Sequence, residues 1–301
     1  CAGVGMVLGL VQYRLGADRL GDAGRPRVLD AGARRALLAR IAAGMALALG
    51  VALLAFALAR AGTIPATVEW FAGATGVVIV AVAAGYSAWL MLAGGLDAGE
   101  RGRVALVFAL FVGAALFWAG FEQAASTLNL FASRHTDRVL FGFELPATWF
   151  QSINAFFIIA LAPIVGAAWV ALDARAPSLP VKFALGLALL GAGFLVLAWG
   201  ASHVTGDARV GPMWLVTTYF LHTVGELCLS PVGLSAVTTL SPRRLVGQMM
   251  GVWFMGAALG NLLAGLAAGR LEGLSPAHLF AYVGVFGCVA AAGFVGLRGA
   301  F

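Results

Sequence analysis

The sequence predicts an all-α polytopic membrane protein. Hydrophobic residues make up 61% of its 301 residues and charged residues only 11%, whereas a soluble domain has about 45–50% apolar and about 25% charged residues. The mean hydropathy is +0.96. Apolar segments of roughly 20 residues or more recur along the chain, and each is long enough for a helix to cross a hydrocarbon core of ~30 Å.

The first apolar segment, 1–16, opens the chain, and we expect it to be the end of a helix and the chain to be a fragment of a longer protein. A polar loop follows at 17–33. The next eight apolar segments are the predicted spans, at about 34–61, 68–95, 104–132, 146–172, 180–200, 211–240, 246–268 and 275–298.

The 19 Lys and Arg residues, against 13 Asp and Glu, are spread over short loops and form no single patch, which argues against a nucleic-acid partner. If loop 17–33 is cytoplasmic, alternation of the spans leaves five basic residues outside: Arg60, Arg134, Arg138, Arg209 and Arg270. The positive-inside rule favours this orientation, because the remaining basic residues then lie on the cytoplasmic side.

Two acids, Glu122 and Glu226, lie deep inside predicted spans. A charged side chain at the bilayer centre costs about 3 kcal/mol on insertion scales, and such residues usually line a substrate or ion pathway. The alternative is a structural hydrogen bond or ion pair between helices. The sequence therefore predicts a function for both acids and leaves this alternative open.

Polar residues recur around each acid at spacings of three or four residues, which places them on one helical face. The face around Glu226 also holds Tyr219, His222, Ser230 and Gly233. The face around Glu122 also holds Trp118, Ser126 and Asn129. Because unpaired polar groups are costly in hydrocarbon, the two faces predict a shared aqueous cavity.

Pro231 and Pro163 lie inside predicted spans. Each lacks an amide hydrogen and clashes with the preceding turn, so each predicts a kink. The kink at Pro231 lies one turn beyond Glu226, where it is suited to act as a gating hinge. A static bend is an equal alternative, since proline is common in membrane helices.

The segment 246–268 contains glycines at four-residue spacing, which favours close helix packing. Trp253 is a large indole near its middle, and it must find either a packing partner or a cavity to face. The residue alone favours neither.

Enzyme chemistry has little support. His222 and Glu226 do not form the H-E-x-x-H pattern of a zinc protease, and the sequence contains no G-x-S-x-G elbow, P-loop or CxxC pair. We therefore expect no enzyme activity, no metal and no organic cofactor.

Three long stretches closely resemble helices of a known family: FWAGFEQAASTLNLFASRHTDRV at 117–139, WFQSINAFFIIALAPI at 149–164, and LHTVGELCLSPVGLSAVTTLSPRRLVGQMMGVWFMGAALGNLLAGL at 221–266. They resemble the seventh, eighth, tenth and eleventh helices of the proton-dependent oligopeptide transporters, a family of the major facilitator superfamily.

The resemblance implies a C-terminal six-helix bundle of a major facilitator fold at 96–301, preceded by an extra two-helix hairpin at 34–95. Residues 1–16 would be the end of the sixth helix, and 17–33 a cytoplasmic loop. The bundle's partner would be an N-terminal six-helix bundle of the same protein.

The resemblance also implies roles for individual residues. Glu122 is similar to the family's proton-linked glutamate. Glu226 looks like the carboxylate that, together with Asn154, holds the charged amino terminus of a peptide. The residues that resemble further substrate-binding and lining positions are Trp118, Ser230, Trp253 and Phe254.

The expected function is proton-coupled symport of di- and tripeptides by alternating access, in the bacterial cytoplasmic membrane. The expected partners are short peptides, protons, lipid and the N-terminal bundle, with the proton as coupling ion. Two alternatives are a same-fold carrier of another solute, such as nitrate or a peptide-like drug, and a non-transporting membrane interaction protein.

Overall fold

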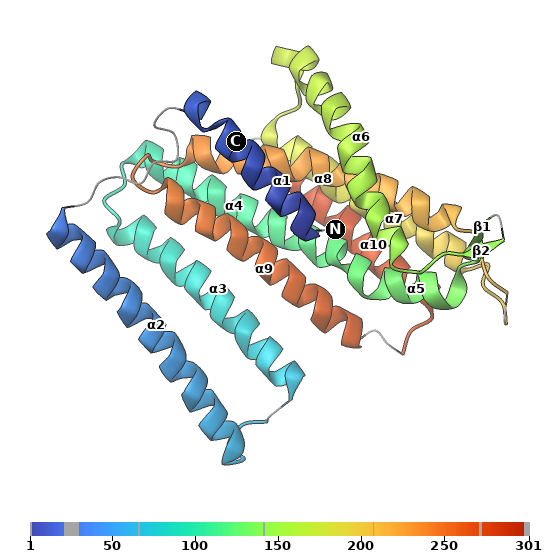
Figure 1. Ribbon diagram of the computed structural model, residues 1–301, viewed down its shortest axis with the longest axis horizontal. Coiled ribbons are helices and arrows are strands. Elements are labelled where there is room, and N and C mark those ends of the chain that lie inside the picture. Colours follow the sequence, from blue (N-terminus) through green and yellow to red (C-terminus); the bar gives the residue numbers. More distant parts are fainter. Residues whose placement is uncertain are drawn as a thin grey trace. The chain divides into compact units, whose positions relative to one another are not determined.

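The computed structural model describes residues 2–20, 30–65, 67–140, 142–206, 208–270 and 273–297. The chain divides into two compact units, Cys1–Ala66 and Thr67–Phe301. Within the predicted loop 17–33, residues 21–29 lie outside the described residues. Figure 1 shows that nearly all described elements are helices.

The first unit contains α1 (Ala2–Leu15), a 3-10 turn η1 (Ala17–Leu20) and α2 (Ala31–Arg60). Helix α2 begins where the Asp30 carboxylate accepts a hydrogen bond of 2.6 Å from the Ala33 amide, which satisfies one of the unpaired amides at the helix start. It buries none of its apolar side chains within its own unit, as expected for a helix that faces lipid.

The second unit contains seven long helices, a broken helix end and a short hairpin. In chain order its elements are α3 (Val68–Ala93), α4 (Ala98–Phe121), η2 (Glu122–Ala125), α5 (Thr127–His135), β1 (Val139–Leu140), β2 (Phe143–Glu144), α6 (Trp149–Leu172), η3 (Asp173–Arg175), α7 (Leu179–Ala201), α8 (Met213–Leu240), α9 (Val246–Arg270) and α10 (Pro276–Gly296).

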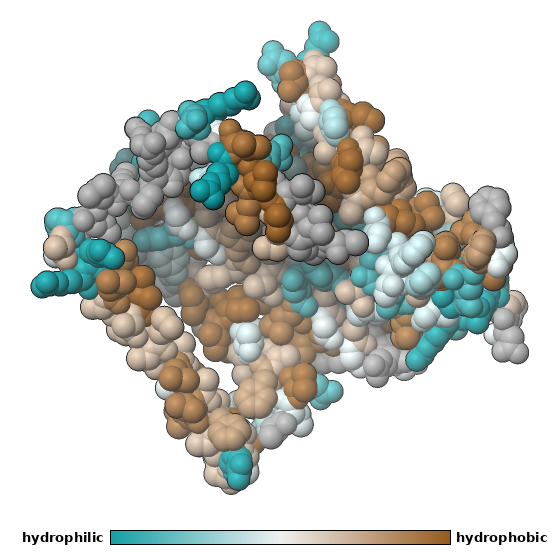
Figure 2. Space-filling model, in the orientation of Figure 1, coloured by the Kyte–Doolittle hydropathy of each residue, from teal (hydrophilic) through white to brown (hydrophobic). Residues whose placement is uncertain are grey.

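Eight helices among the described residues are long and apolar enough to cross a membrane. They coincide with the eight predicted spans, with most ends differing by a few residues. Figure 2 shows hydrophobic residues along the exposed length of α6 and hydrophilic residues gathered near β1 and β2. An all-α, multi-pass membrane protein is therefore confirmed.

The span predicted at 104–132 is present as one candidate membrane span, Ala98–His135, but its helix is not continuous. It begins earlier, at Ala98, because Asp97 and Glu100 form a capping box around the helix start. It also stops at Phe121, and a 3-10 turn separates α4 from α5. The apolar run continues through this turn, so hydropathy alone gives no sign of the break.

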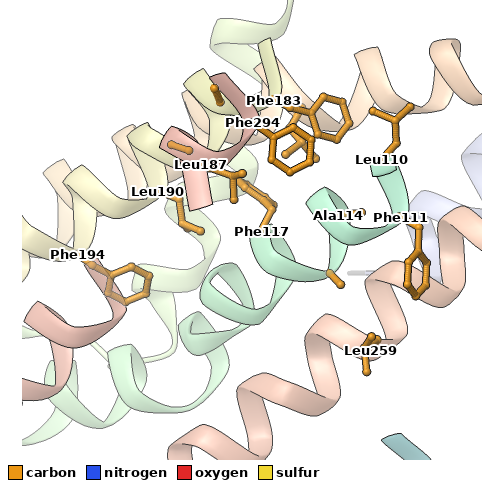
Figure 3. Packing of buried hydrophobic residues seen from close by; sticks show 14 of the residues in the cluster. Leu110, Phe111, Ala114, Phe117, Phe183, Leu187, Leu190, Phe194, Leu259 and Phe294 are labelled. Atoms are coloured by element: carbon orange, nitrogen blue, oxygen red, sulfur yellow. The ribbon is translucent and has the colours of Figure 1, made fainter. Parts of the chain in front are cut away.

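Helix α7 packs against both α8 and α10. Gly186 on α7 and Gly225 on α8 bring the two backbones so close that a Cβ on either would lie within 3 Å of the other's carbonyl oxygen. Aromatic side chains fill the space toward α4 and α10, and Figure 3 shows Phe183 and Phe294 side by side. Their rings stack with centroids 5.6 Å apart.

Helix α9 packs against α4 through the middle pair of its glycines. A Cβ at Gly256 would meet the Phe111 carbonyl oxygen at 2.8 Å, and one at Gly260 would meet the Ala115 carbonyl oxygen at 2.7 Å. At the glycines toward both ends of α9, a Cβ would meet no atom of another segment within 4 Å. The packing role predicted for these glycines therefore applies to the middle pair.

The outer helix α3 packs on α9 and buries only Ala83 and Leu90 among its described residues. The Tyr86 hydroxyl donates a hydrogen bond to Gln248 Oε1 on α9. On the loop between α8 and α9, Arg244 donates to both carboxylate oxygens of Glu100, at 2.9 and 2.7 Å. This hydrogen bonding raises the pKa of Arg244 and joins that loop to the start of α4.

We predict that Gly260→Ala destabilises the bundle by roughly 1–3 kcal/mol, the usual cost of overpacking. The new methyl group would lie 2.5 Å from Trp118 Cβ and 2.7 Å from the Ala115 carbonyl oxygen, where backbone must move. Thermal unfolding of the detergent-purified protein measures the effect. Gly265→Ala on the same helix is the matched control, because its Cβ meets nothing within 4 Å. Equal losses at both positions would contradict the packing role of Gly260.

Candidate functional site

The break between α4 and α5 places Glu122 at a helix end. Glu122 is the C-cap of α4 and the first residue of the 3-10 turn η2. The adjacent Gln123 is 1% exposed, and its Nε2 donates a hydrogen bond of 3.1 Å to the Ala264 carbonyl on α9.

The oxygen of the Gln123 side-chain amide forms hydrogen bonds at the start of α5. Gln123 Oε1 accepts from the Ser126 hydroxyl at 3.2 Å and from the Thr127 hydroxyl at 3.0 Å. These bonds satisfy polar groups locally and stabilise the departure from α-helical geometry. The face predicted to hold Trp118, Glu122 and Ser126 in register is therefore interrupted after Glu122.

Asn154 on α6 joins that helix to Glu226 on α8. Its Nδ2 donates to Glu226 Oε2 at 3.2 Å and to the Thr223 hydroxyl oxygen at 3.0 Å. Thr223 in turn donates to the Tyr219 carbonyl, one turn earlier on α8, at 2.7 Å. The carboxylate of Glu226 is half-buried and is held in place from a neighbouring helix.

The face of α8 around Glu226 turns partly into the bundle. His222 is 1% exposed, and its Nε2 lies 3.2 Å from the Leu190 carbonyl oxygen on α7. Because a carbonyl only accepts, this nitrogen carries the proton in that contact. The ring packs against Phe194 with centroids 4.7 Å apart.

A cavity of about 180 Å³ lies beside Glu122 and beside Asn154, the residue that bonds Glu226. It is lined by Phe121, Glu122, Ala124, Ala125, Gln151, Asn154, Tyr219 and His222. Glu122 therefore faces the same space as Asn154, whose side chain binds Glu226. Both predicted faces contribute residues to this cavity, and α6 does so as well, but Glu226 itself is not among the lining residues.

Further predicted substrate-binding residues lie at different depths. Trp118 is half-buried and packs edge-on against Phe121, 5.2 Å between centroids. Phe254 on α9 is 59% exposed. Ser230 is half-buried, and its hydroxyl oxygen is buried without a hydrogen-bond partner among the described residues.

Trp253 lies inside the C-terminal bundle. It is 4% exposed and covers Gly233 on α8 so closely that a Cβ there would lie 2.1 Å from its ring. Its ring also packs edge-on against Phe183, 6.2 Å between centroids. Of the two interpretations of this indole, the contacts favour helix packing.

Both predicted hinge prolines lie inside continuous helices. Pro163 is within α6 and Pro231 within α8. Each side chain is exposed, and each leaves the carbonyl four residues earlier without its usual amide partner.

Among the described residues, no cationic side chain pairs with either acid of the site. Neither Glu122 nor Glu226 forms an ion pair with a described residue. No group of three or more His, Cys, Asp and Glu side chains suited to a metal was found among the described residues. Two acids without a cation, facing or adjoining one cavity, are an arrangement suited to a cationic ligand or to protons.

Periodicity alone missed Gln123, Gln151 and Thr223. Gln123 and Thr223 are neutral polar residues beside residues of the predicted faces, and each acts through a contact with another helix. Their signal in the sequence is a hydrogen-bonding side chain deep inside an apolar span, because such a group needs a partner there.

A multi-pass bundle with acids around a polar cavity is the architecture of a membrane carrier. A family model described as PTR2, the POT family, matches residues 2–275, and this chain belongs to the POT family.

Known proteins similar to this chain are transporters and not enzymes. The peptide transporter YePEPT of Yersinia enterocolitica is 44% identical over 74% of this chain and 45% of its own length. Dipeptide and tripeptide permease A of Chromobacterium violaceum is 37% identical over 58% of this chain and 35% of its own length. The chain thus spans less than half of these two relatives.

A solved structure of a similar protein has the same fold. The crystal structure of a peptide transporter, POT, in complex with sulfate has a TM-score of 0.80 and is 35% identical. The match covers 98% of this chain and 60% of that chain. The helices of this chain are therefore part of a major facilitator fold.

We predict that Gln123→Leu destabilises the protein by roughly 1–3 kcal/mol, because an apolar side chain makes none of the bonds of this buried amide to the Ala264 carbonyl and the Ser126 and Thr127 hydroxyls. Thermal unfolding in detergent is the measurement. Gln248→Leu is the control, since that exposed glutamine bonds only Tyr86 among the described residues, and it should cost about 0.5 kcal/mol or less. If Gln123→Leu were as stable as the control, the stabilising role of the Gln123 bonds would be wrong.

Proposed function

We propose that the intact protein containing this chain is a proton-coupled symporter of di- and tripeptides in the bacterial cytoplasmic membrane, working by alternating access. Residues 96–301 supply the C-terminal bundle and 34–95 the inserted hairpin. Residues 1–16 end the sixth helix, and 17–33 form a cytoplasmic loop. Membership in the POT family and similarity to peptide transporters support this proposal.

The observation that carries the proposal is the Glu226–Asn154 pair. Asn154 fixes one carboxylate oxygen of Glu226, and the described chain offers that carboxylate no cation. A peptide brings an ammonium group at its amino terminus. Its three N–H donors suit the remaining lone pairs of Glu226 and the amide oxygen of Asn154.

Glu122 is the proposed proton-coupling residue. It lies at the break between α4 and α5 and lines the cavity that Asn154 also lines. In a site withdrawn from water a carboxylate needs either a proton or a cation nearby. Protonation of Glu122 can therefore exchange with an ion pair to the N-terminal bundle, the proposed partner of this chain.

Trp118, Phe254 and Ser230 are proposed to line the substrate side of the site. Phe254 is largely exposed on α9, and the buried Ser230 hydroxyl has no hydrogen-bond partner among the described residues. Trp253 supports the site indirectly, because its ring fills the space at Gly233 on α8. A change at Trp253 would therefore act on the site through helix position.

Pro231 and Pro163 are the proposed hinges. Each removes one backbone hydrogen bond from a helix that carries a residue of the Glu226–Asn154 pair. Bending at either proline would change the position of one partner relative to the other. This is the local motion that rocking of two bundles around a midplane site requires.

The proton gradient is the proposed energy source, and we propose that no metal or organic cofactor takes part. Moving one charge through the membrane potential supplies ~2.3 kcal/mol per 100 mV, and the pH difference adds to it. This is enough to concentrate a small peptide more than tenfold, since a factor of ten requires about 1.4 kcal/mol.

We predict that Glu226→Gln in the intact protein weakens dipeptide binding by roughly 30-fold or more, because removing one partner of a desolvated charge pair costs about 2–5 kcal/mol. Binding of dialanine to the purified protein by calorimetry measures it. Glu69→Gln, which changes an exposed acid in the first turn of α3, should leave binding unchanged. Unaltered binding by Glu226→Gln would exclude the assigned role.

We predict that Glu122→Gln abolishes accumulation of peptide driven by a pH gradient but permits exchange of peptide across the membrane. The amide cannot take up and release a proton, whereas the Glu226–Asn154 pair is retained. Counterflow and gradient-driven uptake in proteoliposomes separate the two activities. Full gradient-driven uptake by this variant would show that another group carries the proton.

A further inference from the structure

A second cavity, of about 470 Å³ and widely open to its surroundings, lies among α6, α7 and α8. It is lined by Trp169, Leu179, Lys182, Pro231, Val232, Ser235, Ala236, Thr239 and Leu240. It shares no lining residue with the cavity that contains Glu122. Its position at the last turns of α6 and the first turn of α7 places it at one end of the spans.

The cation of this cavity is Lys182, the only lysine in the sequence. Its ammonium nitrogen lies 4.6 Å from the centre of the Trp169 ring, a distance typical of a cation–π contact. An ammonium group also carries three hydrogen-bond donors. No described oxygen accepts a hydrogen bond from it, and it forms no ion pair within the described residues.

The indole of Trp169 adds a fourth donor. Its Nε1 is buried and has no hydrogen-bond partner among the described residues. The lining contains no Asp or Glu. Because a buried donor without an acceptor is costly, a cavity with these groups is matched to an anion that offers several oxygens.

The rest of the cavity is aliphatic. Leu179, Val232, Ala236 and Leu240 form its apolar wall, and the outer part of α6 beside it exposes Val170 at 80%. A pocket with one cationic rim and an apolar wall is complementary to a phospholipid. Its volume is within the range of small-molecule sites and holds a headgroup with part of an acyl chain.

The charge distribution identifies the leaflet. The connection between α6 and α7 carries Arg175, a few residues before Lys182 in the sequence, and the positive-inside rule assigns this end to the cytoplasm. The cytoplasmic leaflet carries anionic lipids, and basic pockets between spans on this side bind their headgroups. We propose that this cavity binds the phosphate of an anionic phospholipid of the cytoplasmic leaflet, with Lys182 and Trp169 as donors.

Such a lipid would contact α8 directly beyond its proline. Pro231 and Val232 line the cavity together with residues one and two turns further along α8. Occupancy would therefore stabilise one geometry of the helix that carries Glu226. The inference does not depend on which solute the protein carries.

The test is native mass spectrometry of the intact purified protein with added phosphatidylglycerol or phosphatidylcholine. Lys182→Gln should weaken binding of phosphatidylglycerol roughly fivefold, as expected for one cation near an anionic headgroup. Lys182→Arg should retain binding. Trp169→Phe keeps an aromatic ring, though a smaller one, and removes the N–H group, and it should weaken binding two- to fivefold. Phosphatidylcholine, whose headgroup has no net charge, should bind the unaltered protein more weakly than phosphatidylglycerol.

Arg175→Gln is the matched control, since it removes the same charge close by but outside the cavity lining. Equal losses in Arg175→Gln and Lys182→Gln would show general surface attraction and overturn the proposal. Displacement of the lipid by millimolar inorganic phosphate would show a site for free phosphate, and displacement by dialanine would show part of the substrate pathway. Either result would also overturn it. Lys182→Gln should still bind dialanine, so a loss of lipid binding in this variant can be told apart from a loss of the proposed transport function.

Discussion

The absence of water from the bilayer interior is the constraint on which this arrangement depends. A polar side chain there must find its partner within the protein, because leaving it unpaired costs several kcal/mol. Gln123 finds one on α9, Asn154 on α8, and Thr218 and His222 find theirs on α7. Each bond joins two helices, so the few polar groups of the spans help to determine which helix faces meet, and glycines allow the backbones to approach that closely.

Helix α6 shows how much one polar contact contributes to the site. It buries only Phe150 among its described residues, and its link to α8 includes the Phe157–Phe220 pair, with ring centroids 5.4 Å apart, beside the Asn154 bonds. A helix with so little buried apolar surface is held weakly by packing. The Asn154–Glu226 bond therefore positions α6 as well as the carboxylate, and a ligand that competes for Glu226 would also act on α6.

The helices could be predicted from the sequence because each is a long apolar segment with local start and stop signals. The break at Glu122 could not, because the adjacent Gln123 side chain bonds a carbonyl 141 residues away in the sequence. The role of Trp253 cannot be predicted from its own segment for a similar reason, since the space it fills is left by Gly233 on another helix. The site role of Asn154 is predicted by the family resemblance and not by a periodic pattern, because its partners lie on α8. Local periodicity thus predicts which face is polar, and long-range contacts decide where that face points.

The two intramembrane acids differ in the backbone that carries them, and this difference suits the separate roles proposed for them. Glu226 lies inside the continuous helix α8 and is held by Asn154, so it can exchange a ligand without a change of backbone geometry. Glu122 begins a 3-10 turn, a conformation with poorer hydrogen-bond geometry that often marks a hinge. A change in what Glu122 binds can therefore shift the balance between this turn and a continuous helix. One acid is placed to bind, and the other is placed so that its protonation can alter the shape of the bundle.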